Sequence, residues 1–363
     1  TKSHGWIGYP SKVTKSIEGG ELSTDDSRPR WVRDLTRFLP LKSQFVLTGN
    51  VRDLQMLAVN GRIGAAPLAS VLTGTCADAG YVDTLRWDPV EGFSVLPRPD
   101  GSPGDPTTLL SQFGLAPVDG RAAAGPDLLA ATLERLVARD GDPVALMVDF
   151  SSRLVVRGDA LSPAEQQLLT RALVLGQAGQ ARPAGADRLP RFNTIVWVAD
   201  KEGDLPDWLT IGNPRLRHVP IAPPDRAARS AVAPSLVRNL PGARQAPAKV
   251  IEDAQEDLVD ATEGMLLLDL NAVAQLARTE NVPVAEIGEA VRRYKVGVTE
   301  DAWRRIDRGR IRQGAEIIKR RVSGQDHAVV HMLDIVKRAA TGIGGRRRGG
   351  RPAGLAVCAG PNG

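Results

Sequence analysis

Short apolar runs recur along the chain, each bounded by glycine, proline or another turn-forming residue, and they predict buried strands. These runs occupy residues 44–48, 143–150, 193–200 and 355–359. None of them alternates polar with apolar positions, so each is typical of a strand that is covered on both faces. The pattern therefore predicts an α/β fold built on a buried sheet.

Other segments carry apolar residues at the spacing of an amphipathic helix. We expect helices over residues 31–39, 66–79, 126–138, 261–279, 283–294, 301–320 and 326–339. Two short runs, 81–87 and 92–96, predict a hairpin. Proline and glycine dominate residues 98–127 and 241–248. We interpret the first as a long loop with one turn at Leu109 and Leu110, and the second as a linker. Residues 1–30 show neither period and are expected to form an extended arm.

Composition narrows the class of protein. The 363 residues are 25% charged and 42% hydrophobic, as in an ordinary soluble globular chain, and only 4% are aromatic, so we expect aliphatic cores. The two cysteines, Cys76 and Cys358, lie far apart and suggest neither a disulfide framework nor a zinc site, which fits a cytoplasmic protein. No apolar run approaches twenty residues, so we expect no membrane span. His327 and His331 lie four apart but have no third ligand, so we expect no metal there.

The last residues of the chain carry the most specific motif. The apolar run 355–359 leads directly into Gly360, Pro361, Asn362 and Gly363. A strand that enters a glycine-rich turn is how a phosphate-binding loop of the pattern G-x-x-x-x-G-K-[ST] begins, because bare backbone N–H groups must surround the phosphate. The second glycine, the lysine and the hydroxyl residue would fall past Gly363, so we interpret the chain as a fragment. The alternative is a simple type I or II turn.

The segment before this strand makes the first interpretation more specific. Val322, Ser323, Gly324 and Gln325 precede a helix, a basic glycine-rich loop and then an Arg-Pro pair at 351–352. This order resembles the lead-in to the second ATPase module of Clp-type AAA+ unfoldases. The resemblance implies that Val322 to Gln325 frame an adenine and that Gly360 to Gly363 begin the Walker A loop, with ATP and Mg²⁺ as cofactors.

An earlier part of the chain resembles a first module of the same family whose nucleotide site has been lost. With Gly49 as the first glycine of a Walker A loop, the required Gly, Lys and Ser/Thr positions hold Leu54, Gln55 and Met56. These residues hold neither phosphate nor magnesium. The run 143–150 resembles a Walker B strand that ends in Asp149. Phe150 stands where the family has a glutamate, and a phenyl ring accepts no proton. The run 193–200 resembles the sensor-1 strand, with Asp200 at its end.

Two groups of arginines remain. Arg215, Arg217 and Arg226 lie near the last predicted strand, where the family places an arginine that reaches the neighbouring subunit's nucleotide. In a site without nucleotide, they are interface salt-bridge candidates. Residues 346–351 hold four arginines and indicate either a solvated loop or a contact with nucleic acid.

The resemblance implies a three-layer, P-loop NTPase-like (AAA+) sheet domain, a small all-helical lid and a helical lead-in to a second AAA+ module. We predict these parts as follows: arm 1–30, degenerate sheet domain 31–240, lid 241–298, and linker helix with start of the second module 299–363.

The function implied is that of a tandem ATPase that assembles into a ring, expected to be hexameric, and remodels or unfolds protein substrates, with or without an adaptor. The first module is expected to bind no cofactor and to be structural, and the chain carries no catalytic residues. One alternative is a non-catalytic scaffold or adaptor that uses the sheet domain to bind protein. The other is nucleic-acid binding through residues 346–351.

Overall fold

The computed structural model describes residues 28–59, 62–99, 102, 105–155, 157, 160–297, 308–320 and 322–341. The chain divides into two compact units, the first comprising Thr1–Ala228 with Leu266–Leu268 and the second Arg229–Met265 with Asp269–Gly363. The predicted domain boundaries at 240 and 298 remain predictions.

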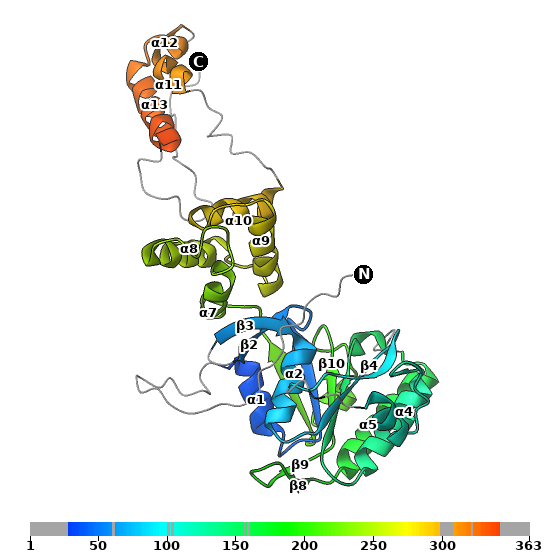
Figure 1. The fold of residues 1–363 in the computed structure, drawn as a ribbon. Helices are drawn as coiled ribbons and strands as arrows, with labels where there is room; N and C mark the ends of the chain where they lie inside the picture. The colour runs from blue at the N-terminus through cyan, green and yellow to red at the C-terminus, as the bar shows by residue number, and fades with distance from the viewer. Residues whose placement is uncertain are drawn as a thin grey trace. The chain divides into compact units, whose positions relative to one another are not determined.

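A seven-stranded sheet forms the first unit, in the order β11-β1-β10-β7-β4-β5-β6 (Figure 1). Its strands are β1 (Gln44–Gly49), β4 (Asp83–Asp88), β5 (Gly92–Val95), β6 (Arg121–Ala122), β7 (Val144–Val148), β10 (Thr194–Val198) and β11 (Leu216–Ile221). The first five strands in that order are parallel, and β5 and β6 continue the sheet in antiparallel pairing. The predicted α/β sheet domain is confirmed.

The three apolar runs near residues 45, 145 and 195 are neighbours in this sheet, as the resemblance requires. Gln44 pairs with Ile195, and Thr194 pairs with Ala145, in parallel register. Every residue of β7 and β10 is buried. The absence of alternation in the sequence therefore reflects a sheet with both faces covered.

Successive residues of each central strand enter two different cores. On one face Val46, Leu146 and Trp197 pack with α4 (Pro126–Ala138) and α5 (Pro163–Ala178). On the other face Phe45, Met147 and Val196 pack with α1 (Arg30–Phe38) and α2 (Leu68–Asp78), and Figure 1 shows the two helix layers on either side of the sheet.

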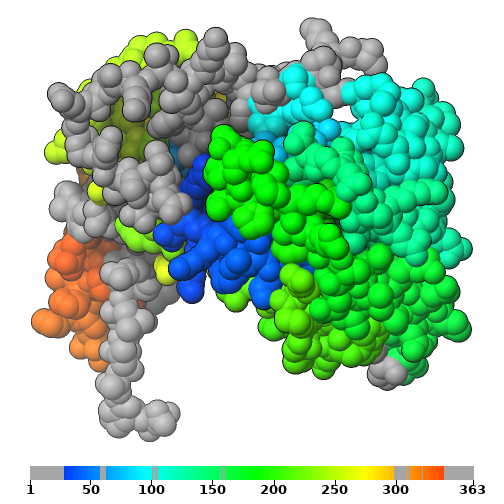
Figure 2. All heavy atoms as spheres, turned by 90° about the horizontal axis from the view of Figure 1, so that it is seen from below, coloured from blue at the N-terminus to red at the C-terminus, as the bar shows by residue number. Residues whose placement is uncertain are grey.

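Three elements of the first unit were not predicted. A hairpin, β2 (Leu54–Val59) and β3 (Arg62–Pro67), directly follows the loop after β1. A second hairpin, β8 (Arg182–Ala184) and β9 (Leu189–Arg191), adjoins the N-terminal part of the unit when seen from below (Figure 2). Helix α5 begins with a capping box between Ser162 and Glu165.

The long loop predicted over 98–127 holds more regular structure than the one turn expected at Leu109 and Leu110. It contains α3 (Pro106–Gln112), whose N–H groups are capped by the Asp105 side chain, and the short strand β6. Two one-turn elements complete the unit, η1 (Ser151–Arg153) and α6 (Asp207–Thr210).

The second unit is helical where it is described. Helices α8 (Ala248–Ala261), α9 (Leu267–Thr279) and α10 (Ile287–Val296), with η2 (Val284–Glu286) and the end of α7 (Arg226–Val237), enclose an aliphatic core. The single helix predicted over 261–279 is wrong at its start. Thr262 and the following residues form a turn in which Gly264 has φ +75°, and α9 begins only at Leu267.

Three further helices belong to the second unit: α11 (Arg308–Arg312), α12 (Gly314–Lys319) and α13 (Asp326–Thr341). The predicted helix over 301–320 is thus two short helices over its described part. No helix in the described ranges is long and apolar enough to cross a membrane.

Candidate functional site

Charged side chains gather at the carboxyl ends of three neighbouring parallel strands. Arg52 follows β1, Asp149 follows β7 and Asp200 follows β10. In open α/β sheets, ligands bind at this edge because the strands end together there and their loops converge. This is the place where the resemblance puts a nucleotide, so its side chains decide whether one fits.

Asp149 is held by two guanidinium groups. Arg52 Nη1 lies 2.6 Å from its Oδ1, and Arg86 Nε and Nη2 lie 3.1 and 2.9 Å from its Oδ2. The backbone N–H of Phe150 also donates to Oδ1, at 2.8 Å. The Asp149 side chain is only 7% exposed. Both oxygens of this buried carboxylate are therefore already satisfied by charge-assisted hydrogen bonds from the protein.

Arg52 connects the ends of β7 and β10. Its Nε donates to Asp200 Oδ1 at 3.2 Å, and Arg153 Nη2 approaches the other Asp200 oxygen at 3.3 Å. The Arg52 guanidinium carbon lies 3.8 Å from the centroid of the Phe150 ring, in cation–π contact. Phe150, which stands where the family has a glutamate, thus positions a cation.

The loop after β1 directs its backbone N–H groups toward the protein. Gly49 N donates to the Asp200 carbonyl, Asn50 N to that of Ile221 and Val51 N to that of Gly49, at 3.2, 2.8 and 2.7 Å. Gly49 has φ +91°, and a Cβ built there would lie 2.6 Å from the Ile221 oxygen. Glycine is thus required here by a close approach of two backbone segments, which the sequence pattern alone does not distinguish from a phosphate loop.

The residues at the Walker A positions have structural partners. Leu54, Gln55 and Met56 belong to strand β2, so no helix N-terminus follows the loop. Gln55 is buried, donates from Nε2 to the Asn50 carbonyl at 2.8 Å and accepts from Trp31 Nε1 at 3.1 Å. At the lysine position, the chain therefore uses a carboxamide to join the loop to α1.

Asp53, in the same loop, is a buried carboxylate with several donors. Asn50 Nδ2 donates to it at 3.0 Å. The backbone N–H groups of Leu267 and Leu268, which belong to the same compact unit, donate at 3.0 and 2.8 Å. Its negative charge is thus stabilised by protein groups.

The contacts described above decide whether ATP with Mg²⁺ could bind at the carboxyl ends of β1, β7 and β10. The loop offers no inward-curled N–H groups, lysine or hydroxyl, and both oxygens of Asp149 are bound by arginines. A guanidinium beside Asp149 also repels a divalent cation from that carboxylate. The residues do not fit the nucleotide. Among the described residues, no group of three or more His, Cys, Asp or Glu could hold a metal ion.

Two of the three interface candidates near β11, Arg215 and Arg217, contact side chains within the chain. Arg217 Nη2 lies 3.2 Å from both carboxylate oxygens of Asp34, and its guanidinium lies over the Phe38 ring of α1. The Arg215 guanidinium faces the Phe192 ring at 5.5 Å. Arg226 opens α7. They do not converge on Asp149, and a role for them between subunits stays a prediction.

The residues predicted to frame an adenine form the turn between α12 and α13. Val322, Ser323, Gly324 and Gln325 are exposed, and Gly324 has φ +74°. An ion pair of 2.7 Å between Lys319 and Asp326 spans the turn. The candidate phosphate loop, Gly360, Pro361, Asn362 and Gly363, lies outside the described residues, as do Cys358 and the arginines at 346–351. The adenine role therefore stays a prediction.

Sequence reasoning located Asp149, Phe150 and Asp200 but missed Arg52 and Arg86. Arg52 lies 97 residues from Asp149 in sequence. The available signal was the combination of a lost lysine with an arginine in the same loop.

Comparison with known proteins identifies the family. Residues 21–222, more than half of the chain, match the family described as AAA+ chaperone, N-terminal Rossmann-like domain. No curated protein matches. Among solved structures, a chain of the E. coli MS115-1 HORMA:CdnC:Trip13 complex is 11% identical, with 72% of this chain and 76% of that chain covered and a TM-score of 0.41. On the family match, this chain belongs to the AAA+ chaperones, and residues 21–222 form their N-terminal Rossmann-like domain.

Proposed function

We propose that this chain is the non-hydrolysing first module, together with the beginning of a second module, of a tandem AAA+ chaperone of Clp type. The protein assembles into a ring in the cytoplasm and remodels protein substrates or complexes. ATP and Mg²⁺ bind in the second module, and the first module holds subunits together.

One observation carries the proposal: Arg52 lies between Asp149 and Asp200 and over Phe150. A nucleotide site needs a carboxylate free to orient magnesium and a base free to activate water. Here the carboxylate is paired with two arginines, and the base is replaced by a phenyl ring. The internal cation also keeps the strand ends together without a ligand, which suits a module with a constant structural role.

Calorimetry of the 363-residue chain with ATP and Mg²⁺ tests the first module. We expect no binding tighter than about 100 μM, which corresponds to about −5.5 kcal/mol. Binding tighter than this that disappears in Asp149→Asn would contradict an inactive first module. Thermal unfolding of the same samples checks that the protein is folded.

The second module is tested in a chain that continues past Gly363. We expect Gly-Lys-Ser or Gly-Lys-Thr to complete the loop that starts at Gly360, and ATP hydrolysis to be lost when that lysine is changed to alanine. A longer chain without this sequence and without hydrolysis would favour a scaffold or adaptor.

Ring formation is tested separately. In sedimentation velocity, we expect the longer chain to form hexamers and Arg226→Ala to shift it toward smaller species. If the longer chain stayed monomeric at all concentrations, the proposed ring assembly would be wrong.

A further inference from the structure

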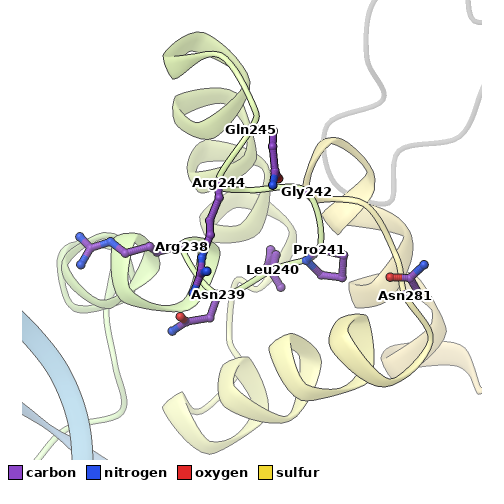
Figure 3. A pocket seen from close by; sticks show the side chains of 8 residues that line it. All are labelled: Arg238, Asn239, Leu240, Pro241, Gly242, Arg244, Gln245 and Asn281. Atoms are coloured by element: carbon purple, nitrogen blue, oxygen red, sulfur yellow. The ribbon is translucent and has the colours of Figure 1, made fainter.

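The loop between α7 and α8 lines a pocket of about 400 Å³ in the second unit (Figure 3). Its rim carries five polar side chains, Arg238, Asn239, Arg244, Gln245 and Asn281, all exposed, and the buried Leu240 lies among them. In Figure 3, Arg244 extends toward Asn239, whereas Arg238 points away from both. The two guanidinium groups thus point in different directions.

The charge of this rim has no counterpart in the described part of the chain. No acidic residue lines the pocket, and neither Arg238 nor Arg244 forms an ion pair with any described residue. Elsewhere in the same unit, Arg293 is paired with Glu280 at 2.5 Å and Glu289 at 3.2 Å. Arginine stays protonated at any physiological pH, so the pocket carries two permanent positive charges.

The available donors select an oxyanion as the ligand. Guanidinium groups only donate, and each of the three carboxamides carries an NH₂ group, of which that of Asn239 already donates to the Ser235 carbonyl at 3.1 Å. Arginine binds carboxylate oxygens in a bidentate geometry, with hydrogen bonds about twice as strong as neutral ones. A ligand that supplies two or more carboxylates therefore matches two arginines flanked by carboxamides.

Two other ligand classes fit less well. Arginine also binds phosphate, but many phosphate sites add converging backbone N–H groups. Here the N–H groups of Leu240, Ala243 and Gln245 already donate to the carbonyls of Val237, Leu240 and Gly242. Single-stranded nucleic acid is held by aromatic side chains that stack on bases, and none lines this pocket. The shallow polar rim instead suits acidic side chains presented by a protein.

We propose that the α7–α8 loop of the second unit binds an acidic segment of a protein partner, with Arg238 and Arg244 as the carboxylate-binding residues. This inference goes beyond the proposed ATPase function and does not depend on it.

A fluorescent hexaglutamate peptide, titrated with the whole chain and followed by anisotropy, tests the site. We expect saturable binding that weakens about tenfold in Arg238→Gln or Arg244→Gln and further in the double variant, because each change removes a hydrogen-bonded charge. The matched control is Arg278→Gln, which removes an exposed arginine from α9 outside the pocket and should leave the affinity within about twofold.

Several outcomes would overturn the proposal. These are absence of binding to the unmodified chain, equal weakening by Arg278→Gln, or retained affinity in the double variant. Competition by inorganic pyrophosphate that far exceeds competition by unlabelled hexaglutamate would identify a phosphate site. Tighter binding of a polythymidine oligonucleotide that also depends on Arg238 and Arg244 would identify a nucleic-acid site. We expect each variant to fold, because the substituted side chains are exposed. Circular dichroism checks this.

Discussion

At the scale of single residues, the most consequential feature is the set of internal contacts that satisfies the Asp149 carboxylate. Its carboxylate is buried, and its stability depends on Arg52 and Arg86. Removing Asp149 takes away the closest acceptor of both guanidinium groups, which leaves Arg52 with Asp200 at 3.2 Å and Arg86 with Asp88 at 3.5 Å. The carboxyl ends of these strands are thus joined by ion pairs within the chain.

We therefore expect Asp149→Ala to lower the free energy of unfolding of the first unit by about 1–3 kcal/mol, the cost of losing hydrogen bonds to a charged group. The control is Asp78→Ala, which breaks the exposed pair with Arg28, where Asp78 is 61% exposed; it should cost about 0–1 kcal/mol. Urea unfolding followed by tryptophan fluorescence measures both, because Trp87 and Trp197 are buried in this unit. Equal values for the two variants would mean that the Asp149 network adds no stability.

Cys76 gives a second test at this scale. Its side chain is fully buried, and burial raises the pKa of its thiol to about 12. Because only the thiolate reacts, we expect Cys76 in a Cys358→Ser chain to resist an aromatic disulfide reagent at pH 8 and to react at once in urea. Rapid reaction in the absence of urea would place Cys76 at the surface instead.

At the scale of elements, the central strands could be predicted from sequence, and the elements around the loop could not. Strands β1, β7 and β10 are mostly apolar, with Gln44, Thr48 and Thr194 as the polar exceptions, because both sheet faces are covered. The sequence shows this composition directly. The hairpin β2–β3 contains Gly64, Ala65 and Ala66, and it lacks the alternation that marks a half-buried strand.

Helix α5 was also missed, although the sequence carries its start signal. Ser162, Pro163 and Glu165 form the capping box and its N1 proline. The ion pairs of Arg52 and Arg86 with Asp149 could not be predicted, because they depend on which strands become neighbours. A single sequence supplies composition and spacing but not register.

The turn at Gly49 allows a matched comparison of two glycines. Gly49 and Gly203 have φ values of +91° and +89°, but only Gly49 has a neighbouring atom, the Ile221 oxygen, where a Cβ would lie. We expect Gly203→Ala to cost about 1–2 kcal/mol, the conformational penalty alone, and Gly49→Ala to cost more. Urea unfolding of the first unit measures both. Similar losses would mean that the loop can move away from β11 without penalty.

Helix α10 makes the second unit sensitive to acid. Hydrogen bonds from Arg292, and then from Arg293, hold the pKa of Glu289 below its usual value of 4.5. A carboxyl whose pKa is lower in the folded state stabilises the protein above the unfolded pKa, and that stability is lost as the pH falls through the folded pKa. We expect the difference in unfolding free energy between the unmodified chain and Glu289→Gln to shrink as the pH is lowered from 6 to 3. A difference that stays constant over this pH range would show that Glu289 does not contribute to the loss of stability in acid.

At the scale of the whole molecule, we propose that the first module holds subunits together and that the second module hydrolyses ATP. A structural module should tolerate changes to its former nucleotide site, provided that it stays folded, because no step of hydrolysis passes through it. Asp149→Asn keeps the size and one acceptor oxygen of the side chain while removing its charge. This change therefore tests the charge of Asp149 at nearly constant side-chain volume.

In a chain that continues past Gly363, we expect Asp149→Asn to leave the rate of phosphate release at saturating ATP within about twofold, when assayed below the unfolding transition of the variant. A tenfold loss corresponds to about 1.4 kcal/mol of activation free energy, which is more than a remote structural change should impose on an intact ring. Changing the loop lysine should abolish phosphate release. If Asp149→Asn abolished it in rings of unchanged size, the first module would take part in hydrolysis, and Arg52 would have to leave Asp149 during the cycle.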